Sequence, residues 1–143
     1  MKRFWTVAPW LTRIILIAPT LIFALIAFKY IAHPVQTATE VGISINKPLA
    51  VTILRFGFGG FPLACSIYIL FCLLSARRVL TGFGFAITII SVALAVRVFG
   101  MLIDGTVAES MRLVRAETVM LVLFIVGTII ERGSRKRRLL PST

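Results

Sequence analysis

Four ionisable residues stand within or beside long apolar stretches of the sequence: Arg55, Arg97, Asp104 and Glu117. A charged side chain near the centre of a bilayer costs about 2.5–3.5 kcal/mol on insertion scales, so it normally faces the protein interior and has a partner. Two arginines and two carboxylates can neutralise one another. They can also line a polar pocket for a charged or polar head group.

The apolar stretches that would position these residues are long enough to cross a membrane. They cover residues 10–32, 49–75, 79–103 and 113–130. Each can supply the ~20 helical residues that cross a hydrocarbon core of ~30 Å, where every backbone amide needs an internal partner. The 143-residue chain is 59% hydrophobic and only 15% charged, which is unlike a soluble domain. The sequence therefore predicts an all-α, integral membrane four-helix transmembrane bundle in a single domain, residues 1–143.

The predicted spans place the four charges in one layer. At a rise of about 1.5 Å per residue, Arg55 and Arg97 each lie about 9 Å inside one end of their helices. Glu117 lies about 7–8 Å deep on the same scale, and Asp104 lies at the rim. We therefore expect the second, third and fourth helices to meet around a cluster of these residues. The ion pairs would either lock the helices in register or line a pocket, and the sequence leaves both hypotheses open.

The end of the first span could complete such a pocket. Tyr30 and His33 lie on the expected side and could form its rim, although both are also common at membrane interfaces. A metal site is not expected, because the chain has one histidine and two cysteines. Cys65 and Cys72 would lie about 10 Å apart on one helix, too far for a disulfide between them. The sequence indicates no cofactor.

The surroundings of Arg55 read "LRFGFGGFP". The glycines resemble a phosphate-binding loop, but such loops join a strand to a helix in water. Within a membrane helix, Gly60 and Ala64 would instead let another helix approach closely. Pro62 lacks an amide hydrogen and should kink the helix near Phe58.

Nine of the sixteen Lys and Arg residues behind the net charge of +11 gather on one side of the predicted bundle. They are Lys2, Arg3, Arg77, Arg78 and those of the tail, residues 131–143. The positive-inside rule then places both termini in the cytoplasm. Nucleic-acid binding is not expected. The tail could recruit anionic membrane lipid or serve only as an anchor; its basic residues are Arg132, Arg135, Lys136, Arg137 and Arg138.

Arg55 with the "GFGG" glycines, Arg97 with the "DG" that follows, and Glu117 in the last span form a familiar pattern. From about residue 13 to residue 130 the chain resembles an uncharacterised bacterial family of four-helix inner-membrane proteins, a domain of unknown function akin to the DoxX-like group. The resemblance implies a four-helix bundle in the bacterial inner membrane and no established activity. DoxX-like proteins include subunits associated with quinone or redox enzymes, and more distant relatives bind or isomerise sterols. No catalytic motif of those proteins is matched here.

Together these observations favour a non-enzymatic inner-membrane protein that binds an amphipathic ligand of lipid or quinone type, or an accessory membrane subunit. A homo-oligomer or a partner subunit is compatible with either. A small dimeric transporter is a second hypothesis, in which Glu117 would exchange protons. A sterol-isomerase-like membrane enzyme is a third, in which Glu117 would act as general base. Neighbouring arginines would keep this carboxylate ionised, which argues against both.

Overall fold

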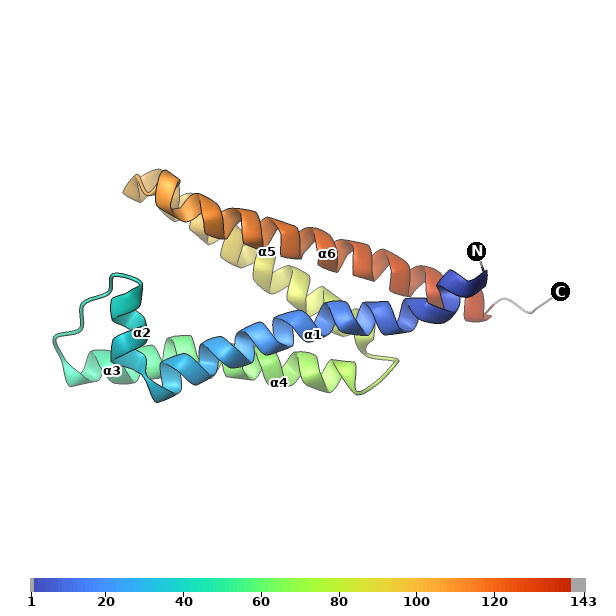
Figure 1. Ribbon diagram of the computed structural model, residues 1–143, viewed down its shortest axis with the longest axis horizontal. Helices are drawn as coiled ribbons and strands as arrows, with labels where there is room; N and C mark the ends of the chain where they lie inside the picture. The colour runs from blue at the N-terminus through green and yellow to red at the C-terminus, as the bar shows by residue number, and fades with distance from the viewer. Residues whose placement is uncertain (1, 140–143) are drawn as a thin grey trace. The chain divides into compact units, whose positions relative to one another are not determined.

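The computed structural model describes the backbone of residues 2–139 and the side chains of residues 9–137. Among these residues there is no strand, so the expected all-α class is confirmed (Figure 1). In chain order the helices are α1 (Lys2–Ala32), α2 (Pro34–Glu40), α3 (Pro48–Leu54), the π-helical turn η1 (Arg55–Gly60), α4 (Phe61–Leu73), α5 (Val79–Asp104) and α6 (Val107–Leu139).

Four helical segments are long and apolar enough to cross a membrane, as predicted, which indicates a multi-pass membrane protein. They are Pro9–Ala32, Pro48–Leu73, Val79–Asp104 and Val107–Arg137. The last helix is longer than the apolar stretch 113–130 from which it was predicted. It begins directly after the Gly105 turn and continues to Leu139, because Glu, Arg and Lys are good helix formers and no proline interrupts them before Pro141. The supposed tail thus begins as part of α6.

The chain divides into two compact units. The first combines Met1–Leu16 with Cys72–Thr143, and the second is Ile17–Phe71. Helix α1 begins in the first unit and ends in the second. Lys2, Arg3 and Arg138, on which the predicted orientation and the basic tail partly depend, lie outside the described side chains, and so do residues 140–143.

Close packing of α5 against α6 holds the first unit together (Figure 1). Gly105, in the left-handed conformation at φ 70°, ends α5 and lets the chain reverse into α6. Phe83 of α5 is fully buried, and a Cβ atom added at Gly127 of α6 would lie 2.5 Å from its ring atoms Cε1 and Cζ. A Cβ at Gly82 would lie 2.9 Å from Cβ of Cys72. Glycines therefore set how closely the helices approach.

The second unit has its own small core of Tyr30, Ala38 and Leu54. The ring of Tyr30 stacks on Phe58 with centroids 5.1 Å apart. A Cβ added at Gly59 would lie 2.7 Å from Cγ1 of Ile31, so Gly59 is the glycine at the close approach. The sequence assigned that role to Gly60, which is exposed here. The assignment was wrong because the π-helical turn rotates the glycines relative to a regular α-helix.

The widened turn η1 lies where the sequence predicted a kink. At its end, the Phe61 N–H donates to the carbonyl of Phe56, five residues earlier, which is the π-helical pattern. Pro62 follows directly and has no N–H to donate. The proline is thus accommodated by an expanded turn, and Arg55 is the residue at which this turn begins.

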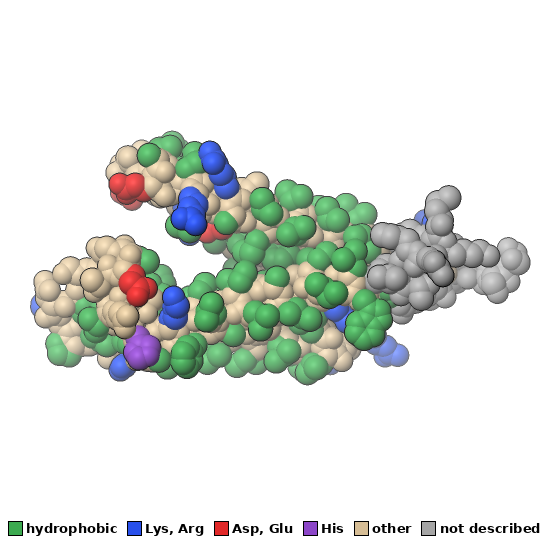
Figure 2. Space-filling view, in the orientation of Figure 1, with side chains coloured by type: hydrophobic (Ala, Val, Ile, Leu, Met, Phe, Trp, Pro, Cys, Tyr) green, Lys and Arg blue, Asp and Glu red, His purple; other side chains and the backbone are tan. Residues whose placement is uncertain are grey.

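The surface of the described helices is mostly apolar. Hydrophobic side chains cover the middle of the helices, while charged side chains lie mainly toward their ends (Figure 2). Large apolar residues such as Leu21, Leu102 and Ile129 are exposed. A bilayer would cover such residues, whereas a monomeric soluble protein rarely exposes contiguous apolar area on this scale.

The Gly127–Phe83 approach gives the first prediction. We expect Gly127→Ala to destabilise the protein by about 1–3 kcal/mol, because the added methyl group must displace a fully buried ring. Thermal unfolding in detergent measures the effect. Adding Phe83→Leu should recover much of the loss, whereas Gly84→Ala, which has open space around it, should change little. Equal losses at Gly127 and Gly84 would contradict the packing argument.

Candidate functional site

Arg97 of α5 and Glu117 of α6 form an ion pair within the first unit. The Nε atom of Arg97 donates to both carboxylate oxygens of Glu117 at 2.9 Å, and Nη2 donates to Oε1 at 2.7 Å. The two side chains are 32% and 14% exposed, respectively. Such a multiply hydrogen-bonded arginine–carboxylate contact is among the stronger charge-assisted interactions. The structure thus brings together two of the four residues of the predicted cluster.

The other two predicted cluster residues lie elsewhere in their units. Asp104 is the last residue of α5, where it is exposed and has no ion-pair partner among the described side chains. Arg55 belongs to the second unit and is exposed at the start of η1. Its membership of the cluster stays a prediction.

The two predicted rim residues differ in their surroundings. Tyr30 is 9% exposed and belongs to the core of the second unit, where it packs on Phe58. His33 is exposed and precedes α2, and its backbone carbonyl accepts a hydrogen bond of 2.8 Å from the Thr37 hydroxyl. A role for either residue at a pocket rim stays a prediction.

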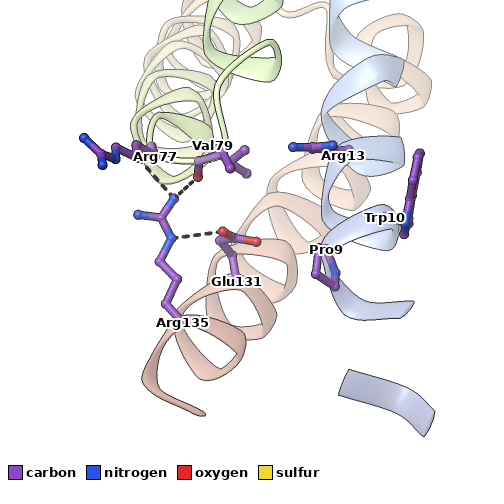
Figure 3. A pocket seen from close by; sticks show the side chains of 8 residues that line it. Pro9, Trp10, Arg13, Arg77, Val79, Glu131 and Arg135 are labelled. Carbon is purple, nitrogen blue, oxygen red and sulfur yellow. Dashed lines mark hydrogen bonds and ion pairs between the residues drawn. The ribbon is translucent and has the colours of Figure 1, made fainter. Parts of the chain in front are cut away.

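A cavity of about 450 Å³ lies within the first unit, where the start of α1, the link after α4 and the end of α6 come together (Figure 3). Its walls combine apolar and charged side chains. They are Pro9, Trp10, Arg13, Ala76, Arg77, Val79, Glu131 and Arg135. The sequence did not predict this site.

Glu131 is the centre of a hydrogen-bond network beside the cavity. It is only 7% exposed, and its Oε1 atom accepts a bond of 2.9 Å from Nε of Arg135. The hydroxyl of Thr12, a fully buried residue of α1, lies 3.0 Å from Oε2 of Glu131 and 3.1 Å from the carbonyl oxygen of Pro9, so its one proton is shared between them. Nη2 of Arg135 donates to the carbonyl oxygens of Ala76 at 2.6 Å and Arg77 at 3.1 Å. One carboxylate and one guanidinium therefore connect α1, α6 and the link between α4 and α5.

Two more arginines line the cavity without such partners. Arg13 is half-buried and extends from α1 toward Val79, and Arg77 is exposed at the edge (Figure 3). Neither guanidinium has an ion pair with a carboxylate among the described side chains. Glu131 and Arg135 neutralise each other, so the cavity keeps a positive charge from Arg13 and Arg77.

The sequence contained weak signals for this site. Glu131 and Arg135 have the i, i+4 spacing of an ion pair on one helix face, and Thr12 and Arg13 interrupt the first apolar stretch. The last span was predicted to end at residue 130, which left Glu131 and Arg135 in the tail. Because a carboxylate in a flexible tail would have no fixed partner, their spacing was not interpreted as an ion pair. The second signal is weak because an arginine near the end of a membrane helix commonly extends its charged group to the interface.

The arrangement is suited to binding and poorly suited to acid–base chemistry. The cavity offers two guanidinium groups and an exposed indole ring, that of Trp10. A general base must be free to take a proton from a substrate. Both Glu117 and Glu131 are instead engaged by arginines. Among the described residues, no group of three or more His, Cys, Asp or Glu side chains could hold a metal ion.

Comparisons of the chain with family models, with curated proteins and with solved structures find no match. The resemblance to the DoxX-like group therefore stays a prediction. The fold and the site geometry carry the functional argument.

The Arg97–Glu117 pair gives the second prediction. Glu117→Gln should destabilise the protein by about 1–3 kcal/mol, because it leaves a partly buried guanidinium without its counter-charge. The double variant Arg97→Met/Glu117→Met should recover much of this loss, since replacing both partners by apolar groups removes the unpaired charge. Unfolding in detergent would measure both variants, with Glu109→Gln, an exposed carboxylate on the same helix, as control. If the double variant lost as much stability as the two single variants added together, the two residues would not be a coupled pair.

The Glu131 network gives the third prediction. Thr12→Val should lower stability by about 1 kcal/mol, because a buried carboxylate oxygen loses its hydroxyl donor. Glu131→Gln should have a larger effect and should also speed tryptic cleavage after Arg77, since Arg135 would no longer be held against the carbonyls of the link. Thr118→Val is the control, because that hydroxyl bonds only to the backbone of its own helix. Unchanged cleavage in Glu131→Gln would show that the link is held by other contacts.

Proposed function

We propose that the protein is a non-enzymatic integral membrane protein that binds a single amphipathic molecule in the cavity beside Glu131. The observation that carries this proposal is a cavity of about 450 Å³ at the end of helices long enough to span a membrane. It joins apolar walls to arginines that have no ion-pair partner among the described side chains. The molecule's head group would occupy the cavity, and its tail would lie along the apolar helix surfaces.

The dimensions and placement of the cavity support this proposal. Sites for small molecules usually enclose about 300–1,000 Å³ and combine apolar walls with a few polar groups. Trp10 lines the cavity, and tryptophan is enriched where membrane meets water. A ligand bound there would have its polar end at the interface and its apolar end in the hydrocarbon.

We place the protein in the bacterial inner membrane with both termini in the cytoplasm. The basic residues Arg77, Arg78, Arg132 and Lys136 support this orientation, because cytoplasmic segments carry an excess of Lys and Arg. The cavity would then open toward the cytoplasmic leaflet. A four-helix protein of this kind is compatible with the DoxX-like resemblance and with a role as accessory subunit, in which the bound molecule would be presented to a partner.

The engaged carboxylates favour binding over the two alternatives. A proton-coupled transporter or a sterol-isomerase-like enzyme needs a carboxylate that gains and loses a proton during each cycle. Arg97 bonds both oxygens of Glu117, and Arg135 and Thr12 between them bond both oxygens of Glu131. In this proposal the Arg97–Glu117 pair fixes the register of α5 and α6, and the ligand binds at the other end of the hairpin.

The fourth prediction tests occupancy of the cavity. Native mass spectrometry of the protein released from its own membrane should show one amphipathic molecule bound per chain. Ala76→Phe should abolish that species, because the ring fills the cavity that Ala76 lines. Ala95→Phe places the same side chain on an exposed position of α5 outside the cavity and should leave the bound molecule in place. If both variants keep the molecule, or if none is bound to the parent protein, the proposal fails.

A further inference from the structure

The charges that line the cavity specify the chemistry of its ligand. Glu131 and Arg135 are bonded to each other, and the Nη2 atom of Arg135 is occupied by the carbonyls of Ala76 and Arg77. The Arg13 and Arg77 guanidinium groups remain, and neither has an acidic partner among the described side chains. The described side chains therefore leave two positive charges unbalanced at the cavity, that of Arg13 in its wall and that of Arg77 at its edge.

An unbalanced guanidinium at this place needs a counter-charge. Arg13 is half-buried on a helix that continues into the membrane, with Pro9 and Val79 among the other cavity walls. The cost of an uncompensated charge rises as water is excluded from it. A bound anion would supply the missing partner, and arginine is the side chain best shaped to bind carboxylate or phosphate oxygens in pairs.

The positive charge of Arg13, with that of Arg77 nearby, favours phosphate over a neutral head group. Arg13 lies on α1 and Arg77 on the link between α4 and α5. The Arg13 guanidinium can bind two oxygens of one phosphate, while Arg77 extends from the cavity edge away from Arg13 and adds positive charge nearby (Figure 3). A quinone ring carries no charge and would leave both arginines unbalanced.

Glu131 also disfavours a zwitterionic head group. An ammonium group beside the phosphate would need an acceptor, and Glu131 is the only carboxylate among the residues that line the cavity. Both of its oxygens are already bonded, one by Arg135 and one by Thr12. The cavity therefore offers strong donors for an anion and little for a cation.

We infer that the cavity binds the phosphate of an anionic amphipathic molecule without an ammonium group, with Arg13 as its main partner and Arg77 as a nearby positive charge at the cavity edge. This inference rests on the proposed function and adds the chemical class of the ligand. Phospholipids of this class are abundant in the cytoplasmic leaflet, toward which the proposed orientation turns the cavity.

The fifth prediction compares three probes on the full-length protein in a neutral detergent: short-chain phosphatidylglycerol, short-chain phosphatidylcholine and inorganic phosphate. Titration calorimetry should show saturable binding of one phosphatidylglycerol per chain, at least tenfold tighter than phosphatidylcholine. Arg13→Gln should weaken the binding about tenfold, because a charge-assisted hydrogen bond contributes about 1.5–3 kcal/mol. Arg77→Gln should weaken it less, since this side chain is more exposed.

Arg132→Gln is the matched control, because it removes the same charge from an exposed position next to Glu131 that does not line the cavity. It should leave the affinity within twofold of the parent protein. Thermal unfolding of each variant without ligand separates a folding defect from a binding defect. If Arg132→Gln weakens binding as much as Arg13→Gln, the interaction is with the basic surface in general and the inference is overturned.

The probes also separate the inference from the proposed function. Equal affinity for phosphatidylcholine and phosphatidylglycerol, with both lost in Ala76→Phe, would overturn the anionic class while supporting an amphipath site. Inorganic phosphate that binds as tightly as phosphatidylglycerol would support the anion site but assign it to a free phosphate. Binding of none of the three probes, with no molecule retained from the native membrane, would overturn both.

Discussion

The cavity end of the first unit depends on the hydrogen bonds that the carboxylate of Glu131 accepts. It lies among apolar helices, where an ion without partners would be costly, and it is satisfied on both oxygens, by Thr12 and Arg135. Arg135 in turn bonds the carbonyls of the link between α4 and α5. Three segments that are distant in sequence thus share one network, and the positions of Arg13 and Arg77 in the cavity wall follow from it.

Much of the architecture could be predicted from composition and helical geometry alone. Apolar length revealed the four spans, because lipid permits no other backbone arrangement for such stretches. The helical rise per residue predicted that Arg97 and Glu117 lie at similar depth. The structure pairs them, because α5 and α6 are joined by a tight turn and run antiparallel. Glu131 was missed for a physical reason: hydropathy detects where a helix leaves the hydrocarbon, and this helix continues beyond that point. The widening at Arg55–Gly60 was foreseen only as a kink at Pro62, because local sequence does not distinguish the two.

The two ion pairs of the first unit differ in the charge that remains beside them. At Arg97–Glu117 the guanidinium and the carboxylate satisfy each other, which suits a contact that only fixes helix register. Arg135 and Glu131 also satisfy each other, but Arg13 and Arg77 beside them have no ion pair with any described side chain. In the proposed function, one end of the helix hairpin therefore has a structural role and the other end binds the ligand. It also shows why a cluster of opposite charges in a sequence is a weaker sign of a ligand site than an excess of one sign beside a cavity.

Both of these carboxylates project from α6. Glu117 and Glu131 are separated by about 21 Å along the helix axis and by nearly whole turns, so they occupy almost the same face. Glu117 is bonded to Arg97 of α5, whereas Glu131 is bonded to Thr12 of α1 and, through Arg135, to the link that precedes α5. With these contacts at two distant positions on one face, α6 can neither rotate about its axis nor slide along α5 without breaking one of them. Loss of the Glu131 contacts alone would leave the cavity end of α6 held to the rest of the unit only by its packing against α5.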